Sequence, residues 1–265
     1  MIVNMPDIPS DIFVNFNGVK FNDDIHKYFV NRKELISVTT IIGLFENEFQ
    51  EEYWSEYKSK EYGISPKEVL FGWKYINLKA TTKGSIVHNY AENLFNNKFF
   101  PYPKELIHNI FGYDPIYDDY LKEKALVDKF YNDSFNKLIP IKTELVVYDI
   151  NLGIGGMVDL LVYNVRAKEF QIWDYKTNRR LTTKNERGHK FKGCLSDLDE
   201  CEMEVYSIQL ATYKYIIEKN TGMKLGKSYL VWVNEANDSY KVIETRDRAE
   251  YAKKMINQYS LGLIV

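Results

Sequence analysis

The stretch that decides the fold predicted for this chain is residues 155–176, GGMVDLLVYNVRAKEFQIWDYK. It contains two runs rich in apolar and β-branched residues, 158–163 and 170–175, of the kind that forms short strands. The polar residues 164–168 separate the two runs and have the composition of a turn. The pattern therefore predicts a β-hairpin near the middle of the chain.

Two acidic residues and a lysine lie on this hairpin: Asp159, Asp174 and Lys176. Side chains alternate between the faces of a strand, so Asp174 and Lys176 project to one side, and pairing can bring Asp159 beside them. Paired carboxylates bind hard cations such as Mg²⁺ or Mn²⁺, which polarise a phosphate and activate water. The three residues predict a phosphodiesterase site. The alternative is that they are ordinary strand-end charges, because Asp-x-Lys is common by chance.

The order Gly-x-Val-Asp, hairpin, Trp-Asp-Tyr-Lys-Thr resembles the core of the PD-(D/E)XK nuclease superfamily, and more narrowly its RecB-like exonuclease branch. That branch includes phage and mitochondrial single-strand exonucleases. The resemblance implies an α+β (α/β), restriction-endonuclease-like fold with a central mixed sheet flanked by helices and an N-terminal helical elaboration. It also implies Mg²⁺ or Mn²⁺ held by Asp159, Asp174 and the backbone carbonyl of Tyr175, with Lys176 positioning the attacking water. Asp174 stands where the wider superfamily more often has Glu.

Two upstream acidic or imidazole positions extend the resemblance. Gly84, His88 and Glu92 match a Gly-x-x-x-His-x-x-x-Glu motif whose histidine contributes to the metal site of the branch. By pattern alone, a helix histidine is more often a packing or surface residue. Glu144, at the start of a predicted strand, falls where the branch has a further acidic residue near the metal, and an exposed strand glutamate is the alternative.

A downstream helix, predicted over residues 205–219, carries Gln209 and Tyr213 one turn apart. The pair resembles the Gln-x-x-x-Tyr motif that follows the catalytic lysine in the branch and steers the scissile phosphate there. A buried tyrosine in an amphipathic helix is the alternative interpretation. With this helix, four motifs follow one another in the order expected for the branch.

Two other segments are candidates for DNA contact. Residues 37–42 have strand propensity, but Ser37 is also a good N-cap for a helix running to residue 45. The branch has a similar segment near DNA, which implies contacts from Ser37 and Thr39. After the hairpin, the loop 177–192 carries a run of basic residues that favours contact with the phosphate backbone. Its first members are Arg179, Arg180 and Lys184. The acidic residues that follow at 197–204 receive no predicted role.

The remaining elements are predicted from periodicity and turn residues. Short strands are expected at 12–16 and 27–30, with turns at 17–18 and 22–24, and helices over 46–80, from Ser85 to 95 and over 121–136. Residues 96–120 are rich in Pro and Asp and predict a loop. We expect one nuclease domain over 1–265, with a hairpin and helical elaboration at 1–82, the core at 83–233, and a C-terminal strand and helix at 234–265.

Composition limits the classes of function. The net charge of 265 residues is −2, so a nucleic-acid site has to be a local basic patch. Two cysteines, Cys194 and Cys201, are too few for a disulfide framework or for the four-cysteine iron–sulfur cluster of some RecB-like nucleases. Neither a signal peptide nor an apolar run of about 18 residues is present, so we expect a cytoplasmic protein of a bacterial or phage-infected cell, not one of the membrane.

The sequence thus predicts a metal-dependent DNA exonuclease that hydrolyses phosphodiester bonds from DNA ends in replication, recombination or repair. Its expected partner is DNA, single-stranded or as an end-containing duplex, with a single-strand-binding protein or a recombinase as the candidate protein partner. The alternatives are a structure-specific or restriction-like endonuclease, or a DNA-binding recombination accessory whose site is vestigial. Cleavage polarity and oligomeric state are left open.

Overall fold

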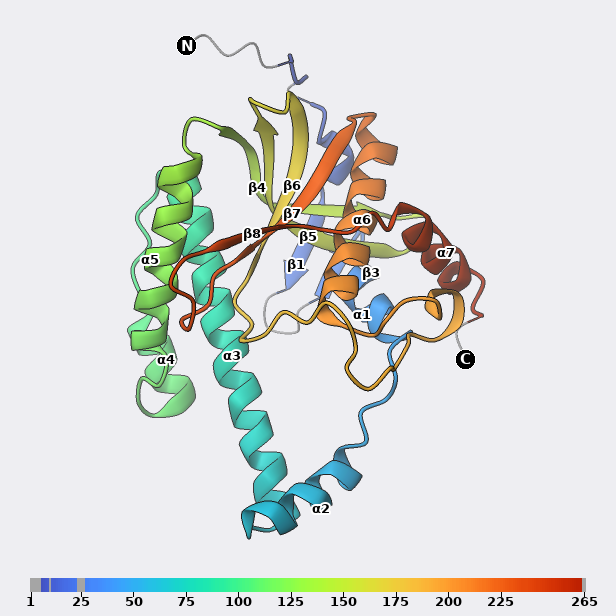
Figure 1. Cartoon of the computed structure of the whole chain (residues 1–265). Coiled ribbons are helices and arrows are strands. Elements are labelled where there is room, and N and C mark those ends of the chain that lie inside the picture. Colours follow the sequence, from blue (N-terminus) through green and yellow to red (C-terminus); the bar gives the residue numbers. More distant parts are fainter. Residues whose placement is uncertain (1–5, 10, 23–26, 264–265) are drawn as a thin grey trace.

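The computed structural model describes residues 6–9, 11–22 and 27–263. It contains one mixed eight-stranded sheet, and the central hairpin forms two of its inner strands (Figure 1). Its strand order is β1-β2-β3-β5-β6-β7-β8, and β4 also pairs with β5. The strands are β1 (Val19–Asn22), β2 (Lys27–Val30), β3 (Lys33–Ser37), β4 (Leu138–Asp149), β5 (Ile154–Asn164), β6 (Glu169–Lys176), β7 (Leu225–Trp232) and β8 (Lys241–Glu244).

The predicted hairpin is confirmed as β5 and β6, which pair antiparallel with Leu160 opposite Trp173. Strand β6 pairs in parallel with β7, and β3 pairs in parallel with the beginning of β5, where Ser37 lies opposite Gly155. Strand β4 runs antiparallel to β5 along almost its whole length. Because β5 is the common partner of β3, β4 and β6, side chains from several segments meet around it.

Helices cover both faces of the sheet (Figure 1). Helices α3, α4 and α5 lie on one side, and α1, α6 and α7 lie on the other. The helices are α1 (Val38–Gly43), α2 (Glu51–Tyr62), α3 (Pro66–Phe95), α4 (Lys104–Phe111), α5 (Tyr117–Ser134), α6 (Glu202–Thr221) and α7 (Ala249–Ser260), with short 3₁₀ turns η1 (Val14–Phe16) and η2 (Gly193–Leu195). The predicted α+β class, with a central mixed sheet flanked by helices, is confirmed.

Two apolar cores separate the layers. Ile41 of α1, Val158 of β5 and Ile216 of α6 are fully buried in the first. Val87 of α3 and Phe130 of α5 pack with strand residues in the second. Burial of these side chains on both faces explains why β5 reads as a nearly continuous apolar run, and it fixes the strand that carries Asp159.

The long helix α3 differs from the prediction of a new helix starting at Ser85. A capping box begins it, in which Ser65 accepts from the backbone of Glu68 and the Glu68 carboxylate accepts from the backbone of Ser65. The helix then continues without a break, and the Ser85 hydroxyl donates to the Thr81 carbonyl instead of capping. Helix α2 and the first half of α3 form an arm that projects away from the sheet (Figure 1). The predicted boundary between residues 82 and 83 lies inside α3.

Other local predictions are corrected by packing. Residues 12–16 contain the 3₁₀ turn η1 rather than a strand, and Phe16 inserts into the first core. Residues 96–120 contain α4 and the start of α5, because Ile107 and Ile116 are fully buried and anchor the segment. The predicted turn at 22–24 includes residues 23 and 24, which lie outside the described part. Among the helices that the structure describes, none combines the length and the apolar character needed to cross a membrane.

Candidate functional site

The β5–β6 hairpin brings the three charged residues of the predicted site together. One carboxylate oxygen of Asp159 accepts a hydrogen bond from the backbone N–H of Tyr175 at 2.7 Å. The Lys176 ammonium lies 2.6 Å from the carboxylate of Asp174, whose side chain is only 3% exposed. Alternation along β6 therefore places Asp174 and Lys176 on the same side of the strand. Asp159 contacts the backbone of Tyr175, the residue between them.

Two more elements supply residues to the same point. His88, on α3, has its Nδ1 3.2 Å from a carboxylate oxygen of Asp159. Glu144, on β4, falls beside Asp159 because Thr143 pairs with Leu160 and Leu145 pairs with Val158. One ligand atom each from His88, Glu144 and Asp159 lie within 4.8 Å of one another. Glu144 has a φ of 46°, a conformation that costs energy for a residue with a Cβ.

Charge crowding at this point shifts several pKa values. Burial raises the pKa of Glu144 to about 8, with a further contribution from Asp159. Burial, and then the charge of Asp159, also raise the pKa of Asp174 to about 6. Burial by itself would lower the pKa of His88, but the carboxylate of Asp159 raises it to about 9. Burial by itself would raise the pKa of Asp159, but the neighbouring His88 holds this pKa below its usual range.

These residues fit a divalent cation. Carboxylate oxygens are the ligands preferred by Mg²⁺ and Mn²⁺, and imidazole is accepted by transition ions such as Mn²⁺. His88, Glu144 and Asp159 already converge without rearrangement, and Asp174 is buried next to them. A cation would neutralise carboxylates that otherwise raise one another's pKa values. The chain can therefore hold a divalent metal at this point.

A cleft of ≈ 730 Å³ opens beside this cluster. Helix α3 lines one side, from Ile76 to His88, and the end of β6 with the first residues of the following loop lines the other. Lys176 and Arg179 reach the cleft wall, as does Tyr206 of α6, whose ring lies 4.4 Å from the Lys176 ammonium. A positive wall next to a cluster of carboxylates is the arrangement that a phosphodiester and its metal require.

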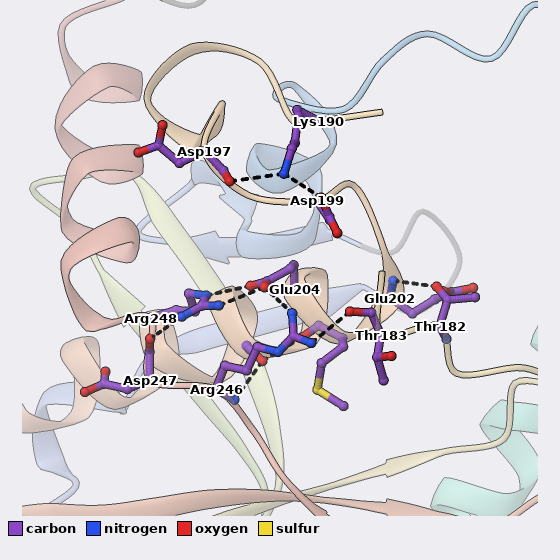
Figure 2. Close-up of polar contacts among 12 residues, drawn as sticks. Thr182, Thr183, Lys190, Asp197, Asp199, Glu202, Glu204, Arg246, Asp247 and Arg248 are labelled. Carbon is purple, nitrogen blue, oxygen red and sulfur yellow. Dashed lines mark hydrogen bonds and ion pairs between the residues drawn. The ribbon is translucent and has the colours of Figure 1, made fainter. Parts of the chain in front are cut away.

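The segment predicted as a basic loop, residues 177–192 (hereafter the basic loop), is anchored by the acidic residues that follow it (Figure 2). The Lys190 ammonium lies 2.6 Å from the Asp199 carboxylate, and the backbone N–H of Thr182 donates to Glu202 at 3.1 Å. Glu204, 2% exposed, accepts hydrogen bonds from both Arg246 and Arg248. Asp199 and Glu202 thus hold Lys190 and Thr182 of the basic loop, a role that sequence reasoning missed because the sequence pattern does not show how the chain folds back on itself.

The basic loop also touches the arm. The guanidinium of Arg187 lies 4.7 Å from the centre of the Trp54 ring on α2, a cation–π distance. Beyond the arm, in the second half of α3, the helix approaches the loop so closely that a Cβ on Gly84 would be 3.2 Å from the Thr177 hydroxyl. Helices α2 and α3 and the basic loop are therefore joined by two contacts into a closed circuit of the chain, and the cleft lies between α3 and the first residues of the loop.

The other predicted contact residues lie around this centre in different environments. Ser37 caps α1, as one of the two interpretations predicted, and its hydroxyl accepts from the backbone of Thr40 at 3.0 Å, while Thr39 is exposed. Gln209 donates to the Tyr213 hydroxyl at 3.0 Å, and both side chains are buried. Tyr213 packs on Gly156, where an added Cβ would be 2.3 Å from its ring. Their contact with DNA stays a prediction.

Comparison with known proteins gives one family. The family model of the PD-(D/E)XK nuclease superfamily matches residues 61–260. Among solved structures 21 chains match. One is a candidate exonuclease from Eubacterium rectale, 17% identical over 83% of this chain and 85% of that chain, with a TM-score of 0.43. Another is SSO0001, 13% identical over 68% of this chain and 85% of that chain, with a TM-score of 0.32. A search of curated proteins found no significant match.

Proposed function

This chain belongs to the PD-(D/E)XK nuclease superfamily, and from that premise we propose that it is a Mg²⁺- or Mn²⁺-dependent deoxyribonuclease that degrades DNA from its ends. The observation that carries the proposal is the convergence of His88, Glu144 and Asp159 within 4.8 Å, next to the Asp174–Lys176 pair. Four chain segments contribute to this cluster. Ordinary surface charges would not be expected to converge from four separate segments. The same order of motifs supports the RecB-like branch.

In the proposed mechanism, His88, Asp159, Asp174 and the backbone carbonyl of Tyr175 would hold the cation, and Glu144 would bind it directly or through water. The bound cation supplies polarisation of the scissile phosphate and a lowered pKa for the attacking water. Burial by itself would lower the pKa of Lys176, but Asp174 and Asp159 raise it, so the ammonium is charged at neutral pH. Lys176 therefore orients the water and stabilises the charge that develops on the phosphate.

The DNA strand is proposed to enter along the cleft beside α3. Arg179 lines the cleft and contacts the backbone there, and Arg180 and Lys184 continue the contact along the basic loop. In this proposal Gln209 and Tyr213 act behind β5, where Tyr213 packs on Gly156 and supports the strand that carries Asp159. Ser37 and Thr39 lie near the same strand, because Ser37 pairs with Gly155.

The closed circuit favours action at ends over action at internal sites. In this proposal, a strand that passes between α3 and the basic loop is enclosed while Arg187 stays on Trp54. A free end can thread through such a circuit, whereas a closed circular molecule can enter only if the contact opens. This supports exonuclease action rather than restriction-like endonuclease action. The intact Asp159, Asp174 and Lys176 argue against a vestigial site.

The test is a cleavage assay on end-labelled linear single-stranded and double-stranded DNA and on closed circular DNA, with Mn²⁺, Mg²⁺ or EDTA. We expect metal-dependent cleavage of linear DNA only, and its loss in Asp174→Ala. Asp128→Asn, which removes a half-buried carboxylate from α5, is the matched control and should cleave normally. Cleavage by Asp174→Ala at the wild-type rate would contradict the proposed active site. Rapid cleavage of circular DNA would show that the protein is an endonuclease rather than an exonuclease.

A further inference from the structure

A cluster of three ionisable side chains joins three elements beside the cleft. The ammonium of Lys83, on α3, lies 2.7 Å from the carboxylate of Glu123 on α5 and 2.6 Å from that of Glu235, which follows β7. The three side chains are 8%, 0% and 24% exposed. Lys83 stands on the same helix as His88, in the stretch where sequence reasoning expected α3 to be interrupted.

A continuous chain of hydrogen bonds leads from this cluster to the end of β6. Asn234, 1% exposed, donates through its amide nitrogen to the Glu235 carboxylate at 2.9 Å and to the backbone carbonyl of Thr177 at 3.0 Å. Thr177 is the residue after Lys176. On the helix side, Gly84 allows the backbone of α3 to approach the Thr177 hydroxyl. Lys83 therefore connects the helix that carries His88 with the strand that carries Asp174.

Burial makes this connection different from the other ion pair on the same side of α3. Lys79 pairs with Asp119 at 3.2 Å, but their side chains are 35% and 29% exposed, so water screens the pair. Removing the Lys83 ammonium would take a hydrogen-bond partner from the fully buried Glu123 side chain and the cation from the partly exposed Glu235 carboxylate, which is unfavourable. The cluster thus resists sliding or rotation of α3 relative to the sheet.

We propose that Lys83 is a positioning residue for the metal site: it fixes α3 against the end of β6, so that the His88 imidazole stays at ligand distance from the carboxylates of Asp159 and Glu144. The inference rests on the proposed function, because it assumes that those three residues bind the cation. It adds a residue that touches neither metal nor DNA, acting through Glu235, Asn234 and the carbonyl of Thr177. Groups that hydrogen-bond a metal ligand directly change metal affinity about 10- to 100-fold when removed. Lys83 acts through intermediate groups, so an effect at the lower end of this range is expected.

The test measures Mn²⁺ binding to the DNA-free protein by isothermal titration calorimetry. We expect Lys83→Met to weaken binding at least about 10-fold. Lys83→Arg keeps the charge and should restore most of the affinity. Lys79→Met is the matched control, since it removes a cleft lysine from the same helix but not the buried connection, and it should bind Mn²⁺ like wild type. Asn234→Ser removes the amide that donates to both Glu235 and the Thr177 carbonyl, while Lys83, Glu123 and Glu235 stay in place. It should weaken binding in the same direction, by a smaller factor.

The outcomes separate the two proposals. If the wild-type protein does not bind Mn²⁺ at all, the proposed metal site itself is contradicted. Wild-type affinity in both Lys83→Met and Asn234→Ser would leave the metal site standing and overturn the role of Lys83. If Lys83→Met does not fold, as shown by circular dichroism, Asn234→Ser decides: weaker Mn²⁺ binding in a folded protein supports the connection, and unchanged binding rejects it.

Discussion

Glu144 combines a strained backbone with a crowded charge. Its φ of 46° is unusual for a residue with a long side chain, and its carboxylate lies near that of Asp159. Both features raise the free energy of the metal-free protein, and both suit a residue held in place for a ligand. At residue scale, we therefore expect a bound cation to stabilise the candidate site, because the metal-free site contains backbone strain and crowded carboxylates.

We expect Glu144→Asn to stabilise the metal-free protein by about 1 kcal/mol and to weaken Mn²⁺ binding, because Asn tolerates positive φ and carries no charge. Urea unfolding in EDTA and calorimetric titration with Mn²⁺ measure the two effects. Lys168→Asn is the matched control, since Lys168 has a φ of 56° in the turn between β5 and β6, away from the cluster. It should share the gain in stability and leave metal affinity unchanged. A loss of stability in Glu144→Asn would contradict the account of strain.

Lys176 and Lys184 should differ in the kinetic constant that they control. Lys176→Met is expected to lower kcat at least about 100-fold, because the ammonium contributes in the transition state. Lys184→Met should instead raise KM for DNA several-fold with little change in kcat, since a backbone contact serves binding. Single-turnover and steady-state measurements on linear DNA check both. A Lys176→Met enzyme with normal kcat would exclude the lysine from the chemical step.

Much of the site was predictable at this scale because it follows from local register. Asp159, Asp174 and Lys176 lie on one hairpin, and a two-residue alternation is enough to bring them together. The partners of Lys83 were not predictable, because Glu123 and Glu235 are 40 and 152 residues away. The same holds for the acidic run 197–204, whose Glu204 binds two arginines 42 and 44 residues further along the chain.

At the scale of elements, α6 is fitted to β5 by one close contact. An added Cβ at Gly156 would lie 2.3 Å from the Tyr213 ring, well inside the sum of van der Waals radii. We therefore expect Gly156→Ala to destabilise the protein by about 1–3 kcal/mol through overpacking. Urea unfolding measures this, and Tyr213→Leu in the same chain should recover part of the loss by making room.

Gly72→Ala provides the comparison, because nothing lies within 4 Å of a Cβ at that position in α3. There the substitution should be neutral or stabilise the protein by up to about 1 kcal/mol, as expected for an open position within a helix. Equal effects of Ala at Gly156 and Gly72 would show that the contact with Tyr213 does not restrict the fit of α6 on β5.

Sequence reasoning predicted the elements around the hairpin better than the arm. The hairpin, α6 and β7 have periodicity and termini that local residues define. The sequence predicts a separate helix from Ser85 to 95, because serine is a good N-cap, but the structure has one helix through this position. The structure keeps the helix intact there through the buried ion pairs of Lys83, an interaction between elements that no local pattern contains.

At the scale of the whole molecule, several raised pKa values act in one direction. The pKa of His88 is raised to about 9 and those of Glu144 and Glu123 to about 8, so the folded metal-free protein holds protons that the unfolded chain has released. Stabilisation from a raised pKa is present in full below the unfolded value and is lost as pH rises through the folded value. The stabilisation that comes from the raised pKa values of these three groups is therefore lost between about pH 5 and 9.

We therefore expect the Tm of the protein in EDTA to fall as pH rises from about 6 to 9. Saturating Mn²⁺ should raise Tm more at the upper end of this range, because metal ligands bind in their deprotonated form. Differential scanning fluorimetry across the range, with EDTA or Mn²⁺, measures both slopes. A metal-dependent gain in Tm that shrinks with pH would contradict the assignment of His88 and Glu144 as ligands.

The contact between Arg187 and Trp54 also has a consequence for kinetics. If DNA threads through the closed circuit as proposed, the strand leaves only past its own end or when the contact breaks, and we expect release to be slower than the next cut. The enzyme would then be processive, removing many nucleotides per binding event, and an excess of unlabelled competitor added after the start would hardly slow it. Trp54→Ala would shorten each run while the rate of each cut stays the same.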